Sequence, residues 1–309
     1  MIGYVSHHIP ILLEPITDFL VTGIEALPEN LSHGIILDCT LGGGGHTSAL
    51  LQRLQEKAPH RPVRVLGIDR DPEAIARNRI KFEKELAEGR LEVHHGSFSD
   101  ALRFAGNRPI VGLLADLGIS SDQIDSEIRG FSFRFPAPLD MRMNTTRGIP
   151  LSDWLEGVGE TELAEVLWKY GEERLSRKIA RRLVDLRAKN ALPKDTAALA
   201  EVIASVFPPP MRYKGIHPAT RSFQALRIEI NEEIRELETL ISKVFPALAP
   251  GGRLALLSFH SLEDRLVKEA FRTRELYRIH TKKPLQADDE ELARNPRSRS
   301  AKLRLAERI

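Results

Sequence analysis

The chain has a single cysteine, Cys39, among its 309 residues, so no disulfide can form within it. So few thiols suit a reducing compartment. No apolar run approaches the ~20 residues that a membrane-spanning helix needs. Residues 1–20 also lack the basic region and long apolar core of a signal peptide. We therefore expect a cytoplasmic protein that contacts no membrane.

Net charge is also small, at +2, but it is unevenly distributed. Residues 265–309 carry 13 Lys and Arg against 7 Asp and Glu, and residues 171–189 carry 7 against 3. Clusters of positive charge attract polyanions such as nucleic acid. A solvated helix face explains either cluster equally well.

Four consecutive glycines, 42–45, lie between an apolar run and a helical pattern in LDCTLGGGGHTSALL. Glycines in such a turn let a ligand approach the backbone. The run lacks the lysine of a phosphate-binding P-loop. It also lacks the G-x-G-x-x-G spacing of a dinucleotide-binding turn, since Thr47 or Ser48 stands at the last position. S-adenosylmethionine, which has no phosphate, is compatible with the run.

Short β-rich apolar runs alternate with helical patterns in the first part of the chain, which is typical of βαβ units and a parallel sheet. The patterns predict strands at 34–40, 63–69, 90–98, 110–118 and 253–259, an antiparallel closing pair at 276–282 and 301–307, and helices at 46–57 and 72–89.

The alternation stops after Gly118, and residues 151–206 have a helical pattern throughout. One long helix is expected over 221–248, before the fifth strand. We therefore predict an α/β domain made of residues 1–133 and 214–309. A helical subdomain at 134–213 interrupts it.

Polar and aromatic residues follow the predicted strands, whose carboxyl ends meet at one edge of a parallel sheet. Asp69 ends the second strand, and its carboxylate could accept both hydroxyls of a ribose. NAD enzymes place an acid similarly, so Asp69 alone does not identify the ligand. Phe98 follows the third strand and is either a cofactor lid or a core residue.

Motifs spread from residue 8 to about residue 308 resemble the MraW family of bacterial 16S rRNA (cytosine-N(4))-methyltransferases. The most specific are LDMRMN at 139–144 and SFHSLEDR at 258–265. HHIPILLEP, GIDRDPEAI and HPATRSFQALRIEIN occur in the family order. The family commonly has glycine where this chain has Cys39, a change that we expect to be tolerated.

The resemblance implies a class I (Rossmann-like) S-adenosylmethionine-dependent methyltransferase sheet with an inserted helical subdomain. It implies S-adenosyl-L-methionine as cofactor and 16S rRNA, in the small ribosomal subunit, as partner. The acceptor would be the N(4) amine of cytidine 1402 in the decoding centre. The sequence is compatible with a monomer and with a homodimer. The family's cofactor contacts fall on Gly44, Gly45, His46, Asp69, Phe98, Asp116 and Gln123.

The cytosine amine is a poor nucleophile, because its lone pair is delocalised into the ring. The enzyme must align it for attack and must accept its hydrogens. Candidate catalytic residues near the strand ends are Asp116, Ser120 and His260. For Asp116, a cofactor contact and an amine acceptor remain alternatives. Attack by nitrogen needs no cysteine nucleophile, which agrees with Cys39 lying inside a strand.

Several residues are candidates for RNA contact. The predicted helix at 172–189 places its cations largely on one face and its leucines on another, and we expect the basic face to guide rRNA. Aromatic residues of RGFSFRF could stack a base, although a core role is equally compatible. The candidates are Arg177, Lys178, Arg181, Arg182, Phe131, Phe133, Phe135, Arg221, Arg227, Ser261 and Arg265.

The histidine pairs His7–His8 and His94–His95 lack further ligands at metal spacing, so we predict no metal site. Two other functions stay open. One is a Rossmann-type NAD(P)-dependent oxidoreductase, against which the failed dinucleotide spacing counts. The other is a noncatalytic RNA-binding protein that retains a methyltransferase fold.

Overall fold

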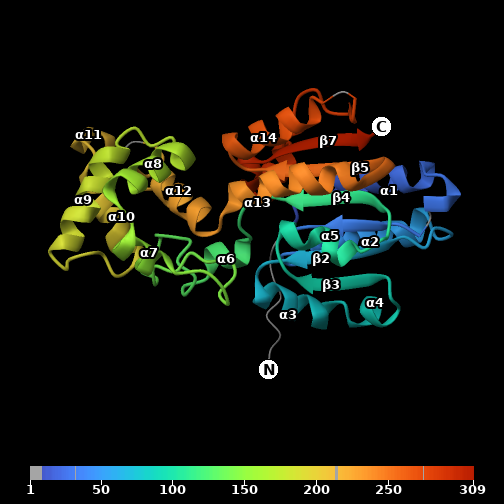
Figure 1. Ribbon diagram of the computed structural model, residues 1–309, viewed down its shortest axis with the longest axis horizontal. Coiled ribbons are helices and arrows are strands. Elements are labelled where there is room, and N and C mark those ends of the chain that lie inside the picture. The colour runs from blue at the N-terminus through green and yellow to red at the C-terminus, as the bar shows by residue number, and fades with distance from the viewer. Residues whose placement is uncertain (1–8, 32, 213–214, 274) are drawn as a thin grey trace. The chain divides into compact units, whose positions relative to one another are not determined.

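The computed structural model describes residues 9–31, 33–212, 215–273 and 275–309. The His7–His8 pair lies outside these residues. The chain divides into two compact units (Figure 1). The first comprises Met1–Gly118 with Ile234–Ile309, and the second comprises Ile119–Glu233.

The second unit extends beyond the predicted insertion, 134–213, on both sides. Asn231, directly after α12 (Thr220–Ile230), shows why it does. Its Nδ2 donates to Met141 O at 2.7 Å and its Oδ1 accepts from Met143 N at 2.6 Å. These contacts tie the end of α12 to the loop around 141–143, so both belong to one unit.

The first unit contains a seven-stranded sheet in the order β3-β2-β1-β4-β5-β7-β6. Strands β1 to β5 pair in parallel, and β7 pairs antiparallel with both β5 and β6. The predicted α/β class and the antiparallel closing pair are confirmed. The strands are β1 (Ile35–Asp38), β2 (Arg64–Asp69), β3 (Leu91–His95), β4 (Ile110–Asp116), β5 (Leu248–Ser258), β6 (Tyr277–Ile279) and β7 (Lys302–Arg308).

The central strand β1 is buried along its whole length and feeds two cores. Ile36 belongs to one hydrophobic cluster, while Ile35 and Leu37 belong to the other. Successive side chains of a strand point to opposite faces, so the two clusters lie on the two faces of the sheet. An apolar run without polar alternation is what a sheet covered on both faces requires.

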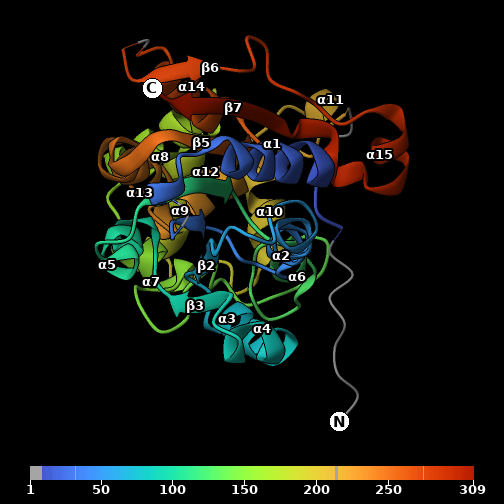
Figure 2. The same cartoon turned by 90° about the vertical axis from the view of Figure 1, so that its right-hand side faces the viewer.

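Helices of the first unit cover both faces. The cluster containing Ile36 includes residues of α1, α2 and α3, and α1 packs against α2 and β5 (Figure 2). The other cluster includes residues of α5, α13 and α14. These helices are α1 (Leu13–Ala26), α2 (Gly45–Lys57), α3 (Pro72–Lys81), α4 (Glu83–Ala87), α5 (Ala101–Ala105), α13 (Glu233–Thr239), α14 (Ser261–Phe271) and α15 (Asp289–Arg294). Single turns are 3₁₀ at Glu29–Leu31, Phe98–Asp100, Phe245–Ala247 and Pro296–Ser300, and π at Leu240–Val244.

Two predicted helices are broken in the structure. The helix expected at 72–89 is divided at Phe82, whose side chain turns into the core. The helix expected at 221–248 is divided after α12, where Glu232 has a left-handed φ of 49°. Its last part is a π turn and a 3₁₀ turn that includes Pro246, and β5 begins five residues earlier than predicted, at Leu248.

The second unit is helical, as predicted for 151–206, although that stretch forms four separate helices. In α9 the residues Ile179, Ala180 and Leu183 are buried, whereas the cations of the opposite face are exposed. The helices are α6 (Ser121–Asp125), α7 (Leu151–Gly157), α8 (Glu160–Gly171), α9 (Ser176–Ala188), α10 (Thr196–Ser205), α11 (Pro209–Arg212) and α12.

In the part of the chain that the structure describes, none of the helices combines the length and the apolar character needed to cross a bilayer.

Candidate functional site

The glycine loop connects β1 to α2 at the carboxyl edge of the sheet. Gly42 and Gly44 have positive φ angles of 49° and 71°, which glycine adopts without strain. Gly44 N donates to Leu41 O at 2.7 Å, which closes the turn just before the helix. The loop therefore needs glycine at these two positions for its backbone conformation alone.

The space beside the glycines differs along the loop. A Cβ on Gly44 would overlap Asn78 and Phe82, and one on Gly45 would overlap Pro10. Gly42 is open, since its Cβ would meet only Thr40 O, at 3.8 Å. Packing within the protein therefore accounts for Gly44 and Gly45, and the open side of the loop is at Gly42.

Asp69, at the end of β2, is bonded to this loop. Its Oδ2 accepts from Gly42 N at 2.7 Å, and its Oδ1 accepts from Asp71 N at 2.8 Å. Burial raises the pKa of Asp69 to about 6, while these two amides act in the opposite direction. A carboxylate has about four acceptor sites, so each oxygen keeps capacity for a ligand hydroxyl.

His46 lies at the start of α2 with its side chain buried. Its Nε2 is 3.1 Å from Ile11 O, and burial lowers the pKa of the imidazole to about 4. The ring is therefore neutral at physiological pH and serves as a donor to the N-terminal segment. This contact occupies Nε2, whereas the backbone N–H of His46, in the first turn of α2, has no partner within its own helix.

Three acidic residues lie where the adjacent strands β1, β4 and β5 end. Asp38 ends β1, Asp116 ends β4, and Glu263 is in the first turn of α14, which follows β5. Asp38 is buried and accepts from Thr47 Oγ1 at 2.6 Å and from Thr40 N at 3.1 Å. Burial, the charge of Asp38 and the charge of Glu263 raise the pKa of Asp116 to about 8.

The side chain of Asp116 makes no hydrogen bond to any described residue, although its backbone N donates to Thr40 Oγ1 at 2.6 Å. It is only partly buried, so its carboxyl group can receive a ligand. A perturbed carboxyl group at a strand end is a functional-site candidate on physical grounds.

His260 is the N-cap of α14. Its Nδ1 accepts from Glu263 N at 3.4 Å, and its Nε2 lies 3.0 Å from Glu263 Oε1. The Glu263 carboxylate thus contacts the imidazole, and the charge of the same carboxylate raises the pKa of Asp116. The structure thus gives His260 a capping role at the start of α14.

Phe98 begins a 3₁₀ turn after β3, is partly buried and packs against the core cluster of Ile35. Ser120 and Gln123 belong to the second unit, where they form a capping box on α6. Ser120 Oγ accepts from Gln123 N at 3.2 Å, and Gln123 Oε1 accepts from Ser120 N at 3.1 Å. The Ser120 hydroxyl is therefore engaged in a cap.

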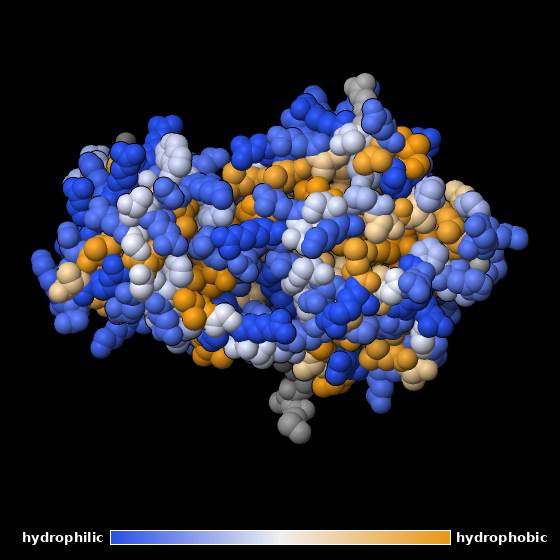
Figure 3. Space-filling model, viewed as in Figure 1, coloured by the Kyte–Doolittle hydropathy of each residue, from blue (hydrophilic) through white to orange (hydrophobic). Residues whose placement is uncertain are grey.

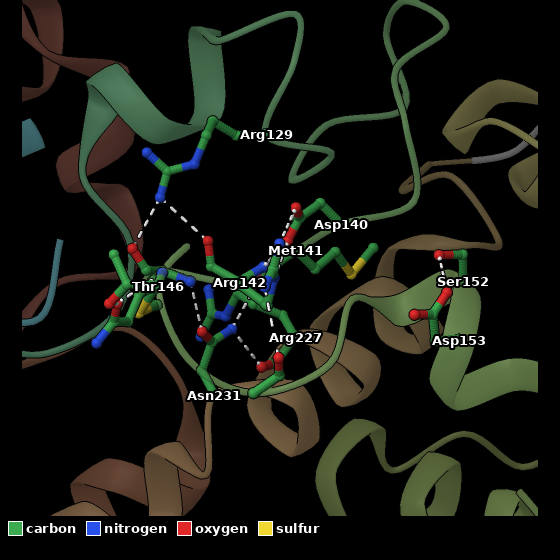
Figure 4. Close-up of polar contacts among 12 residues, drawn as sticks. Arg129, Asp140, Met141, Arg142, Thr146, Ser152, Asp153, Arg227 and Asn231 are labelled. Atoms are coloured by element: carbon green, nitrogen blue, oxygen red, sulfur yellow. Dashed lines mark hydrogen bonds and ion pairs between the residues drawn. The ribbon is translucent and has the colours of Figure 1, made fainter. Parts of the chain in front are cut away.

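The LDMRMN segment forms a tightly held loop in the second unit (Figure 4). Buried Arg129 donates from Nη2 to Arg142 O at 3.0 Å and to Met143 O at 2.8 Å. Asn231, directly after α12, holds the same segment. Met141 has a left-handed φ of 59°, a strained conformation that persists only where the surroundings fix it.

Other RNA candidates have structural partners. Arg227 is paired with Glu233 through two bonds of 2.8 and 2.9 Å. Phe133 packs edge-on against Phe223 and at a tilt against His217, at centroid distances of 4.8 Å in both cases. Phe131 is buried, whereas Phe135 is half-buried. The core alternative therefore holds for Phe131, and Arg227 forms an ion pair within the protein.

The four candidate cations of α9, which are Arg177, Lys178, Arg181 and Arg182, are all exposed. In Figure 3 hydrophilic side chains lie along the edge of the surface at this helix, with apolar ones between them. Among them, Arg181 makes a 3.4 Å contact with Glu160. Arg221 donates to Glu172 O at 3.3 Å, and Arg265 and Ser261 are exposed. The basic face predicted for this helix is confirmed as a surface, though not as an RNA site.

Among the described residues, no three His, Cys, Asp or Glu side chains are grouped as metal ligands. Burial raises the pKa of the Cys39 thiol, so this residue is an inert core group.

Four residues that shape the site were missed in the sequence. Asp38 ends β1 and could have been found by the strand-end rule that identified Asp69. Glu263 is the third residue of α14, where its side chain contacts His260 and its charge raises the pKa of Asp116. Asn78 and Lys81 contact the glycine loop from α3, 36 and 38 residues away. Nothing in their local sequence marks these two, because the contact depends on how α3 packs.

The sheet order, the reversed β7, the glycine turn after β1 and the acid ending β2 define a class I S-adenosylmethionine-dependent methyltransferase. The model of the MraW methylase family matches residues 5–309. This chain therefore belongs to the MraW methylase family.

Curated relatives agree with this assignment. A protein of Nostoc sp. is 46% identical over 301 residues, which cover 97% of this chain and 92% of the relative. A protein of Nostoc punctiforme is 48% identical, covering 89% and 88%. A protein of Synechococcus sp. is 46% identical, covering 98% and 96%. Each of these relatives is named ribosomal RNA small subunit methyltransferase H.

Proposed function

We propose that this chain transfers the methyl group of S-adenosylmethionine to the N(4) amine of cytidine 1402 in 16S rRNA. The observation that carries the proposal is the hydrogen bond that joins Asp69 to the glycine loop. The 2.7 Å bond from Gly42 N fixes the carboxylate beside the open side of the loop. The curated relatives, which are named small-subunit rRNA methyltransferases, support the choice of substrate.

The residues present fit the donor. Asp69 retains acceptor capacity for two ribose hydroxyls, and Gly42 leaves the backbone open on one side. The first amides of α2 have no partner within their own helix and are suited to bind the carboxylate of the donor's methionine moiety. When bound, the donor supplies an electrophilic methyl group. The proposed contacts are Gly44, Gly45 and His46 through their backbone, with Asp69, Phe98, Asp116 and Gln123.

Asp116 is the proposed acidic group at the acceptor side of the reaction. Its carboxyl group has no partner among the described residues, so it can accept hydrogen bonds from an amine or contact the donor. Burial and its acidic neighbours raise its pKa to about 8, so it can also hold a proton near neutral pH. Ser120 and His260 are secondary candidates, since both have capping partners.

The second unit is the proposed rRNA-binding part. The exposed cations of α9 support this proposal, because phosphate contacts dominate the affinity of proteins for nucleic acids. The proposed substrate form is rRNA within the small ribosomal subunit, and the proposed location is the cytoplasm, where that subunit is assembled.

The test is mass spectrometry of 16S rRNA from cells that lack the gene. Complementation with the wild-type chain should restore the N(4)-methyl group on cytidine 1402, and complementation with Asp69→Ala should not. Full modification in the deleted cells, or equal rescue by both chains, would contradict the proposal.

A further inference from the structure

We infer that Asn78 is a positioning residue for the methyl-donor site, and that its side chain on α3 fixes the backbone of the glycine loop. This inference rests on the proposed function. Asn78 lies on α3, outside the loop, and its side chain is 1% exposed. It therefore does not reach the donor, and any effect on the donor must pass through the loop.

The Asn78 amide has a single orientation. Its Nδ2 donates to Gly42 O at 2.7 Å and to Ala74 O at 2.8 Å. Rotating the amide by half a turn would place Oδ1 against these two carbonyl oxygens. Because two acceptors cannot bond each other, the two carbonyls determine which way the amide points.

This orientation leaves Oδ1 buried without a hydrogen-bond partner among the described residues. A buried acceptor with no partner is costly, so its retention calls for a compensating role of the same side chain. The other end of the amide holds Gly42. Oδ1 points toward Gly44, where an added Cβ would overlap it. The position of Asn78 therefore requires glycine at position 44.

Gly42 is held at both ends. Its N donates to Asp69 Oδ2 at 2.7 Å, and its carbonyl accepts from Asn78 at the same distance. The bond from Asn78 thus fixes the peptide plane beside the carboxylate proposed to bind the ribose. Lys81 Nζ also donates, to Gly43 O at 2.7 Å, but Lys81 is exposed to solvent. Of the two side chains that bond the loop from α3, Asn78 is the buried one, and a second bond to Ala74 O holds its amide in place.

The chemistry requires an amide at position 78. Leucine has a similar size but no donor, so Gly42 O would lose its partner. Aspartate has the same shape but, when ionised, places an acceptor against Gly42 O and Ala74 O. A protonated aspartate regains one donor. Asn78→Asp should therefore recover as the pH falls.

The experiment measures S-adenosylmethionine affinity by calorimetry in the full chain. Asn78→Leu should weaken binding at least tenfold, while affinity for 16S rRNA stays within twofold. Asn78→Asp should bind weakly at pH 8 and recover at least threefold, relative to wild type, at pH 5.5. Arg79→Gln, on the exposed face of α3, is the matched control and should bind normally.

A purely structural role predicts a lower melting temperature with unchanged donor affinity in the folded variants, and this result would overturn the inference. If the variants do not fold, a measurement on the wild-type chain still tests the inference. The side-chain amide protons of Asn78, observed by nitrogen-15 NMR, should shift when the donor is added, and no shift would also overturn it. Absence of donor binding by the wild-type chain would instead contradict the proposed function.

Discussion

The imidazole Nε2 of His46 lies 3.1 Å from the carbonyl oxygen of Ile11, so the first turn of α2 is bonded to the N-terminal segment. Pro10 packs on Gly45, and Leu12 N donates to Glu291 Oε1 at 2.7 Å. Residues near both ends of the chain thus converge on the start of the helix that follows the glycine loop. The side chain of His46 stabilises this arrangement.

His46→Ala should therefore lower the free energy of unfolding by about 1–3 kcal/mol, because it leaves a buried carbonyl without a donor. His46→Gln keeps a side-chain N–H and should lose less. Urea denaturation measures both. Donor affinity of His46→Gln should stay within about threefold of wild type if the backbone makes the contact. A tenfold loss in a stable His46→Gln variant would assign the side chain to the donor site.

Asp69→Ala should weaken S-adenosylmethionine binding at least tenfold, or by ~1.4 kcal/mol. The variant removes the proposed ribose acceptor and also the partner of Gly42 N. Calorimetric titration of the folded variant measures the effect. Unchanged affinity would remove Asp69 from the site.

Asp116→Asn separates the two roles proposed for this residue. A contact with the donor alone predicts weaker donor binding and recovered turnover at saturating donor. An amine acceptor predicts near-normal donor binding with turnover lower by about 10²–10⁴. Calorimetry and single-turnover kinetics distinguish these results. Normal values in both would exclude Asp116 and direct attention to Ser120 and His260.

The same variant should change how stability depends on pH. Burial and its acidic neighbours raise the pKa of Asp116 to about 8 in the folded state, above its ordinary value of 3.8. The folded state then binds more protons than the unfolded state between these values, so this group lowers stability as the pH rises. Asp116→Asn should therefore be more stable than wild type at about pH 8.5, without donor.

Near pH 4 the two chains should have similar stability, since Asp116 is protonated in the folded state. Urea denaturation at both pH values gives the difference. Asp38 and Asp69 follow the same sign, with pKa values raised by burial to about 6, but they are present in both chains. An equal difference at the two pH values would show that Asp116 is not perturbed.

Charge-neutral substitutions of Arg177, Lys178, Arg181 and Arg182 should weaken rRNA binding and flatten its dependence on salt. All four are exposed on α9, so the fold should tolerate their loss. Filter binding at several salt concentrations measures the slope. A double control, Arg79→Gln with Lys243→Gln, removes two exposed cations of the first unit and should leave the slope unchanged. An unchanged slope in the quadruple variant would show that the α9 face is merely solvated.

Much of the first unit could be predicted because its signals are local. Buried strands such as 34–40 and the acid ending β2 follow from periodicity and strand-end geometry. Helix breaks at Phe82 and Glu232 could not be predicted, since each depends on a side chain or backbone angle fixed by packing. The same limit applies to Asn78, whose role depends on the contact between α3 and the glycine loop. His46 and Ser120 were recognised as site residues, but their bonding partners were not.

The most direct test of the central claim is methyl transfer by the purified chain. Small ribosomal subunits from cells lacking the gene are incubated with the protein and isotopically labelled S-adenosylmethionine, and the rRNA is digested and sequenced by mass spectrometry. The label should appear on N(4) of cytidine 1402 and be absent with Asp69→Ala. Label at another nucleotide, or no transfer by a chain that binds the donor, would contradict the account.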